Sequence, residues 1–117
     1  MRIGDVVYEL DVVCYAPGAG EVLAIGAGLT AAGDQVEAYV QAYVGEPYVG
    51  VRIGDGPGSL VEASLGRSLD FYIQDDVIRV SAIRFVRGLD LESGEGESVG
   101  FGELEIRCNG YEADPPL

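Results

Sequence analysis

The chain has 117 residues and a mass of 12.3 kDa, which allows one domain with a modest core. Its formal charge is −13, from 20 Asp and Glu residues against 7 basic residues, and Lys, His and Trp are absent. These absences exclude a histidine base or metal ligand and a lysine Schiff base. The acidic balance disfavours nucleic-acid binding, because it repels phosphate backbones. Such a composition is also typical of GC-rich genomes and of adaptation to high salt.

The hydropathy of the chain predicts a folded protein outside the lipid bilayer. Apolar residues make up 48% of the sequence, which is enough to form a core despite the charge. The longest apolar runs are far shorter than a membrane span. No basic segment followed by an apolar one appears at the N-terminus, so a signal peptide is expected to be absent or removed.

Apolar residues alternate with a period of two along most of the chain, which predicts many β-strands. The expected strands are 6–15, 21–29, 36–44, 48–54, 69–74, 77–87 and 99–108. Segment 60–66 is either a short strand or one turn of helix, and the glycine-rich segment 54–58 is a loop. We expect a single β domain over residues 1–110 and a flexible tail over 111–117.

Two hairpins can be predicted with their register. In the first, Gly45 and Glu46 form a type II′ turn, and Pro47 begins the returning strand. The predicted pairs are Tyr43 with Tyr48, Ala42 with Val49, Gln41 with Gly50, Val40 with Val51, and Tyr39 with Arg52. This register gives one apolar face, formed by Ala38, Val40, Ala42, Val49, Val51 and Ile53, and a one-residue slip would destroy it.

In the second hairpin, Asp75 and Asp76 form the turn. The predicted pairs are Ile73 with Ile78, Tyr72 with Arg79, Phe71 with Val80, Asp70 with Ser81, and Leu69 with Ala82. Alternation breaks at Ala82–Ile83, which predicts a β-bulge. The acidic segment 89–98 is then a long connection to the last strand. Two such hairpins with further strands predict an all-β antiparallel sandwich or partly open barrel of about seven or eight strands.

The two cysteines, Cys14 and Cys108, continue the alternation of apolar residues in the first and last expected strands, so each lies on the apolar face of its strand. Both side chains should therefore point into the core, and we expect them to form a disulfide. Such a bond would contribute roughly 4–5 kcal/mol in the chain-entropy model and would require an oxidising compartment. The alternative is two buried free thiols in a cytosolic protein. A zinc site is not expected, because two cysteines without histidine do not complete a usual ligand set.

Several short motifs follow one another along the chain: the strand Asp11–Cys14, the turn Ala16–Gly20, the strand end Ala24–Gly28, the turn Gly88–Asp90 and the closing strand Glu103–Cys108. Their order resembles that of the mycobacterial 19 kDa lipoprotein antigen family. The resemblance implies a non-enzymatic, secreted or cell-envelope protein with an adhesin or antigen role. Family members carry a lipidated cysteine, whereas Cys14 follows Asp-Val-Val and lacks a lipobox. Membrane attachment would therefore need a lipid anchor that this chain does not contain.

One candidate partner-binding face is formed by Tyr39, Tyr43, Tyr48 and Arg52 on the outer side of the first hairpin. Tyr and Arg are enriched in recognition surfaces, and tyrosine rings stack on sugars, so a protein or glycan partner is expected there. The structural alternative is that these side chains form cross-strand aromatic and cation–π pairs, Tyr39 with Arg52 among them. The second hairpin would hold a similar pair, Tyr72 with Arg79.

Other chemistry is not expected. The acidic loop contains Asp90, Glu92, Glu95 and Glu97, which could surround Ca²⁺ but lack the EF-hand pattern, so a solvated charge run is expected. A carboxylate pair of glycosidase type would need an aromatic-lined cleft, and a His-dependent triad is excluded. We therefore expect no catalytic site, no cofactor and no metal. The function expected is an extracytoplasmic interaction domain, and the alternative is a small-ligand or glycan-binding β domain.

Overall fold

Strands account for nearly all of the regular structure, as the alternation predicts. The computed structural model describes residues 1–16, 21–43, 47–56, 58–65, 69–74 and 76–108, together with the backbone of 111–112. Helix is absent from these residues, so the all-β class is confirmed. The strands are β1 (Arg2–Ile3), β2 (Val6–Val7), β3 (Asp11–Tyr15), β4 (Val22–Leu29), β5 (Gln35–Ala42), β6 (Tyr48–Ile53), β7 (Leu60–Ala63), β8 (Tyr72–Gln74), β9 (Val77–Arg87), β10 (Glu97–Arg107) and β11 (Tyr111–Glu112).

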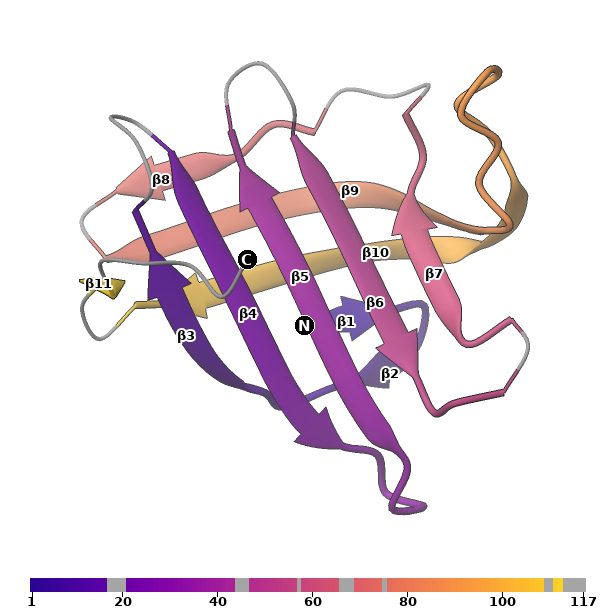
Figure 1. The fold of residues 1–117 in the computed structure, drawn as a ribbon, viewed down its shortest axis with the longest axis horizontal. Helices are drawn as coiled ribbons and strands as arrows, with labels where there is room; N and C mark the ends of the chain where they lie inside the picture. The colour runs from indigo at the N-terminus through magenta and orange to yellow at the C-terminus, as the bar shows by residue number, and fades with distance from the viewer. Residues whose placement is uncertain are drawn as a thin grey trace.

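All described strands belong to one sheet that curls into a half-barrel. Its order is β11-β3-β4-β5-β6-β7-β9-β10-β1-β2, and β8 pairs separately with β9. The strands β3 to β7 form one layer, and β9 and β10 cross behind them at a large angle (Figure 1). Pairing of β7 with β9 joins the two layers along one side. Neighbouring strands are antiparallel except β11, which runs parallel to β3.

A disulfide between Cys14 of β3 and Cys108, directly after β10, spans the open side of the half-barrel. The Cα atoms of the two cysteines lie 5.7 Å apart, and both side chains are buried. A narrow cavity of about 50 Å³ continues along this seam, between Leu10 and Val12 on one side and Leu104 and Ile106 on the other. Both the predicted disulfide and its position in the core are confirmed.

The core lies between the two layers and is filled by the inward positions of the alternating strands. Its fully buried members are mostly β-branched, which suits packing on a pleated surface. Phe85 is the largest of them and has no exposed surface. Its ring lies over Gly102, where an added Cβ would meet a Phe85 ring carbon at 2.7 Å and the Arg2 carbonyl oxygen at 2.2 Å. Glycine at position 102 therefore makes room for both the ring and β1.

The predicted register of the first hairpin is wrong by two residues. The observed pairs include Gln41 with Tyr48 and Glu37 with Arg52, so the predicted pairs of Tyr43 with Tyr48 and Tyr39 with Arg52 do not form. The predicted apolar face is nevertheless correct, and all of its members are buried or half-buried. A shift of two residues keeps every side chain on its face, so alternation cannot distinguish the two registers. The predicted turn at 45–46 lies outside the described residues.

The second hairpin has the predicted register, with Ile73 opposite Ile78 and Tyr72 opposite Arg79. The pairing ends there, so the predicted pairs of residues 69–71 do not form. Asp75 lies outside the described residues. The predicted bulge is confirmed, because Ser81 and Ala82 together lie opposite Glu103, and Ala82 has a φ of 55°.

Other strand boundaries also differ from expectation. Segment 6–15 is divided into β2 and β3, because Tyr8 turns aside to donate its amide to the Met1 carbonyl. The undecided segment 60–66 contains the strand β7, which extends over 60–63. The last strand, β10, begins at Glu97, two residues earlier than predicted, and pairs there with Arg87.

Candidate functional site

The predicted tyrosine face lies on the outer side of β5 and β6 and is partly assembled. The rings of Tyr39 and Tyr48 lie side by side, with centroids 6.1 Å apart and planes at 60°. Tyr39 is opposite Gly50, and the Tyr48 ring covers that glycine, where an added Cβ would lie 2.5 Å from the Tyr48 hydroxyl. The aromatic pair therefore covers Gly50, a strand position that has no side chain of its own to pack.

The hydroxyl of Tyr48 is held by β7. It donates to Glu62 Oε2 at 2.5 Å, a bond strengthened by the carboxylate charge. Burial above all, and then this hydrogen bond and the negative charge of Glu62, raises the pKa of Tyr48 well above its ordinary value of 10.0. Burial also raises the pKa of Tyr43, with smaller contributions from Tyr39 and Glu21.

The raised pKa of Tyr48 makes stability fall at high pH. Below pH 10 the group is neutral in both states, and above it the unfolded chain ionises first, which favours unfolding. Y48F should lower the free energy of unfolding at pH 7 by about 1 kcal/mol, through the lost bond to Glu62. It should also reduce the loss of stability between about pH 9 and 11 in urea titrations. The control Y72F, at a residue that is 53% exposed, should change the free energy of unfolding at pH 7 by less than about 0.5 kcal/mol. An unchanged pH dependence in Y48F would contradict this assignment.

Arg52 does not join the tyrosines through a direct cross-strand pair. It lies opposite Glu37, and its Nη1 donates to Ser59 Oγ at 3.0 Å, in the connection between β6 and β7. The predicted Tyr39–Arg52 pair is therefore wrong, since the two-residue change of register separates these positions along the strands. The partner-binding role of Tyr39, Tyr43, Tyr48 and Arg52 stays a prediction.

A second polar cluster joins β7, β9 and the acidic loop. Ser64 is only 2% exposed, and its hydroxyl lies 3.1 Å from the Gly94 carbonyl oxygen and 3.0 Å from Glu95 Oε1. Glu95 also forms an ion pair with Arg84. The amide of Leu65 donates to the same Gly94 carbonyl at 2.9 Å. This cluster anchors one end of the acidic loop to the sheet.

S64A should lower the free energy of unfolding by about 1 kcal/mol, because the buried Ser64 hydroxyl no longer bonds to Gly94 and Glu95. Urea titration measures this change, and faster hydrogen exchange of the Leu65 amide should accompany it. The matched control is S98A, at an exposed position of β10, where we expect a change within about 0.5 kcal/mol. Equal losses in the two variants would show that the Ser64 contacts do not anchor the loop.

The rest of the acidic loop is an ordered turn. Gly94 donates its amide to the Asp90 carbonyl at 2.7 Å, and Glu92 donates its own to Asp90 Oδ1 at 2.9 Å. Over the described ranges, no three carboxylates or thiols gather in a way that would hold a metal ion. The same ranges contain no helix long and apolar enough to cross a membrane.

Sequence reasoning missed Glu62 of β7 and Ser64, which directly follows β7. Glu62 holds the Tyr48 hydroxyl, and Ser64 holds the acidic loop. The only available signal was the two-residue spacing of the apolar residues Val61 and Ala63, with polar residues between and after them. A strand of four residues is too short for this spacing to exclude a helical turn.

No family model, curated protein or solved structure matches this chain.

Proposed function

We propose that this chain is a non-enzymatic extracytoplasmic domain, secreted or held at the cell envelope, that acts by surface interaction. The observation that carries the proposal is the buried Cys14–Cys108 disulfide. Disulfides persist in oxidising compartments and are rare in the cytosol of mesophiles. The bond ties the two sides of a small half-barrel, where the hydrophobic core alone gives limited stability.

The sequence adds two supports to this proposal. The chain has neither His nor Lys, which removes the commonest general base and the amine that forms Schiff bases. The order of its cysteine and glycine motifs resembles the 19 kDa lipoprotein antigen family, so we include kinship with that family and an adhesin or antigen role in the proposal.

The location can be tested on intact cells of the source organism. Antibodies raised against the folded domain should label unpermeabilised cells or detect the protein in the culture medium. Antibodies against a cytosolic enzyme serve as the control and should label permeabilised cells alone. Detection of this chain in the cytosol alone would overturn the proposal.

A second candidate function is the binding of a small ligand or glycan. The tyrosine face is a weak candidate for it, since the Tyr48 hydroxyl already donates to Glu62 and the Tyr48 ring is packed over Gly50. A cleft on the other layer of the half-barrel favours this function more strongly.

A further inference from the structure

A cleft of about 520 Å³ lies on the outer side of β9 and β10. One wall comes from the β1–β2 hairpin, at Arg2 and Val7, and the other from β8 and the residues before it, at Tyr72 and Asp70. This volume is within the range of small-molecule sites. The cleft is separate from the tyrosine face, which lies on β5 and β6.

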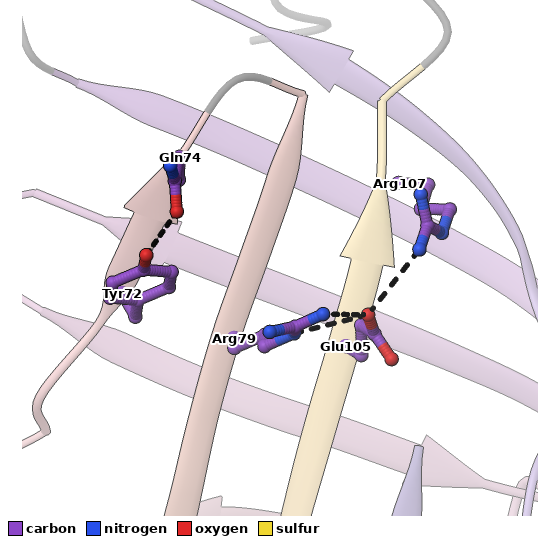
Figure 2. Close-up of polar contacts among 5 residues, drawn as sticks. All are labelled: Tyr72, Gln74, Arg79, Glu105 and Arg107. Atoms are coloured by element: carbon purple, nitrogen blue, oxygen red, sulfur yellow. Dashed lines mark hydrogen bonds and ion pairs between the residues drawn. The ribbon is translucent and has the colours of Figure 1, made fainter.

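Side chains of three neighbouring strands form a row along one end of the cleft. Tyr72 of β8 is opposite Arg79 of β9, and Arg79 is opposite Glu105 of β10. Figure 2 shows these side chains on the same side of the sheet, with the Tyr72 hydroxyl directed to Gln74. The Tyr72 ring is 53% exposed, so its apolar surface is open to a ligand.

Two Arg–Glu pairs lie in the cleft, together with the carboxylate of Asp70 and the hydroxyl of Ser81. Arg79 Nε and Nη2 both contact Glu105 Oε1, at 3.1 and 2.9 Å. Arg2 Nε contacts Glu103 Oε1 at 3.2 Å. Glu103 and Glu105 are two residues apart on one strand and therefore lie about 7 Å from each other on the same face.

In each pair, one carboxylate oxygen and one guanidinium nitrogen remain without a hydrogen-bond partner among the described residues. Within the described part of the chain, Oε2 of both carboxylates and Nη1 of Arg79 take part in no hydrogen bond. The same holds for Nη2 of Arg2, whose Nη1 donates to the Gly4 carbonyl. A ligand could use these atoms without breaking either ion pair.

A β-bulge lies in the floor of the cleft. Ser81 lines the cleft, and with Ala82 it faces Glu103 on the neighbouring strand. Ala82 has a φ of 55°, a left-handed conformation that costs a non-glycine residue about 1–2 kcal/mol. Bulges and such backbone outliers concentrate beside functional sites, because they redirect side chains. The bulge is therefore a second, independent feature of this site.

We propose that this cleft binds a neutral carbohydrate, with a sugar ring packed on Tyr72 and its hydroxyl groups bonded to the Arg79–Glu105 and Arg2–Glu103 pairs. This assignment rests on the proposed function of the chain as an interaction domain. A hydroxyl group is both donor and acceptor, so adjacent hydroxyls match the alternating carboxylate and guanidinium atoms. The apolar face of the sugar matches the exposed face of the tyrosine ring.

The charges in the cleft disfavour ionic ligands. An anion at the free guanidinium nitrogens would lie close to the carboxylates of Glu103 and Glu105, in a protein with a net charge of −13. A cation at the free carboxylate oxygens would likewise lie close to the guanidinium groups of Arg2 and Arg79. A neutral polyol bonds to both members of each pair without either repulsion.

The proposal can be tested by titrating the ¹⁵N-labelled chain with neutral oligosaccharides of glucose, galactose and mannose, at concentrations up to about 10 mM. We expect at least one of them to shift the amide signals of residues 79–82 and 103–105. Y72A and E105Q should each weaken that binding about tenfold or more, whereas Y72F should retain it. The matched control Y39A, on the tyrosine face, should bind like the wild type. Unchanged amide dispersion confirms that each variant is folded.

Three results would overturn the proposal: no shift with any of the neutral sugars, a loss of binding in Y39A but not in Y72A, or a response only to glucuronic acid or glycine betaine. The last would assign the cleft to an ionic ligand. None of these results affects the location test, and a cytosolic location would leave the sugar titration unchanged. Failure of this site and failure of the proposed function are therefore distinguishable.

Discussion

The double variant C14A/C108A is expected to lose about 4 kcal/mol of unfolding free energy at neutral pH. The disulfide closes a loop with a sequence separation of 94 residues, and in the chain-entropy model such a loop gives a value near the upper end of the usual range. The loss is large compared with the total stability of a domain of this size. Guanidinium or urea titration of oxidised wild type and of the double variant measures it directly.

The effect should appear first at the seam of the half-barrel. The bond ties β3 directly to the end of β10, so without it amide exchange should accelerate most in β3 and in residues 104–107 of β10. Wild type reduced with dithiothreitol is the control and should resemble C14A/C108A. Equal unfolding midpoints for oxidised and reduced wild type would contradict the stabilising role of the disulfide.

F85A is expected to lower the free energy of unfolding by about 3–5 kcal/mol. Phe85 is fully buried between the two layers, and its ring lies over Gly102, which has no side chain to fill the space that the ring vacates. The variant should therefore combine the loss of buried apolar surface with a residual cavity. Chemical denaturation monitored by circular dichroism gives the change in free energy.

F101A provides the comparison within the same pair of strands. Phe101 lies on β10, and 49% of its surface is exposed, so its truncation should cost about 1 kcal/mol or less. The difference between the two variants isolates the contribution of burial. If F85A and F101A lost the same free energy, the two-layer core would not be the main source of stability.

Alternation alone predicted most of the fold, because it decides which face of a strand is buried. It placed Val40, Val49 and Val51 in the core, and it placed Cys14 and Cys108 there as well. The bulge at Ser81–Ala82 was predictable for the same reason, since an extra residue interrupts the alternation.

Register and short strands could not be predicted in the same way. A two-residue shift between β5 and β6 preserves both faces, so the choice depends on the turn and on tertiary contacts such as Tyr48 with Glu62. The candidate cleft was missed for a related reason. Arg2 and Tyr72 come from distant parts of the chain, and the pairing of β1 with β10 and of β8 with β9 brings them to one cleft with Glu103.

The most direct test of the central claim is a peptide map of the protein purified from its source after alkylation of free thiols. Trypsin cleaves after Arg, and the chain has no Lys, so Cys14 falls in peptide 3–52 and Cys108 in the peptide that begins at residue 108. We predict that these two peptides appear as one linked species, which separates only after reduction. If both cysteines carried the alkylating group before reduction, the half-barrel would lack its bond, and the extracytoplasmic assignment would be contradicted.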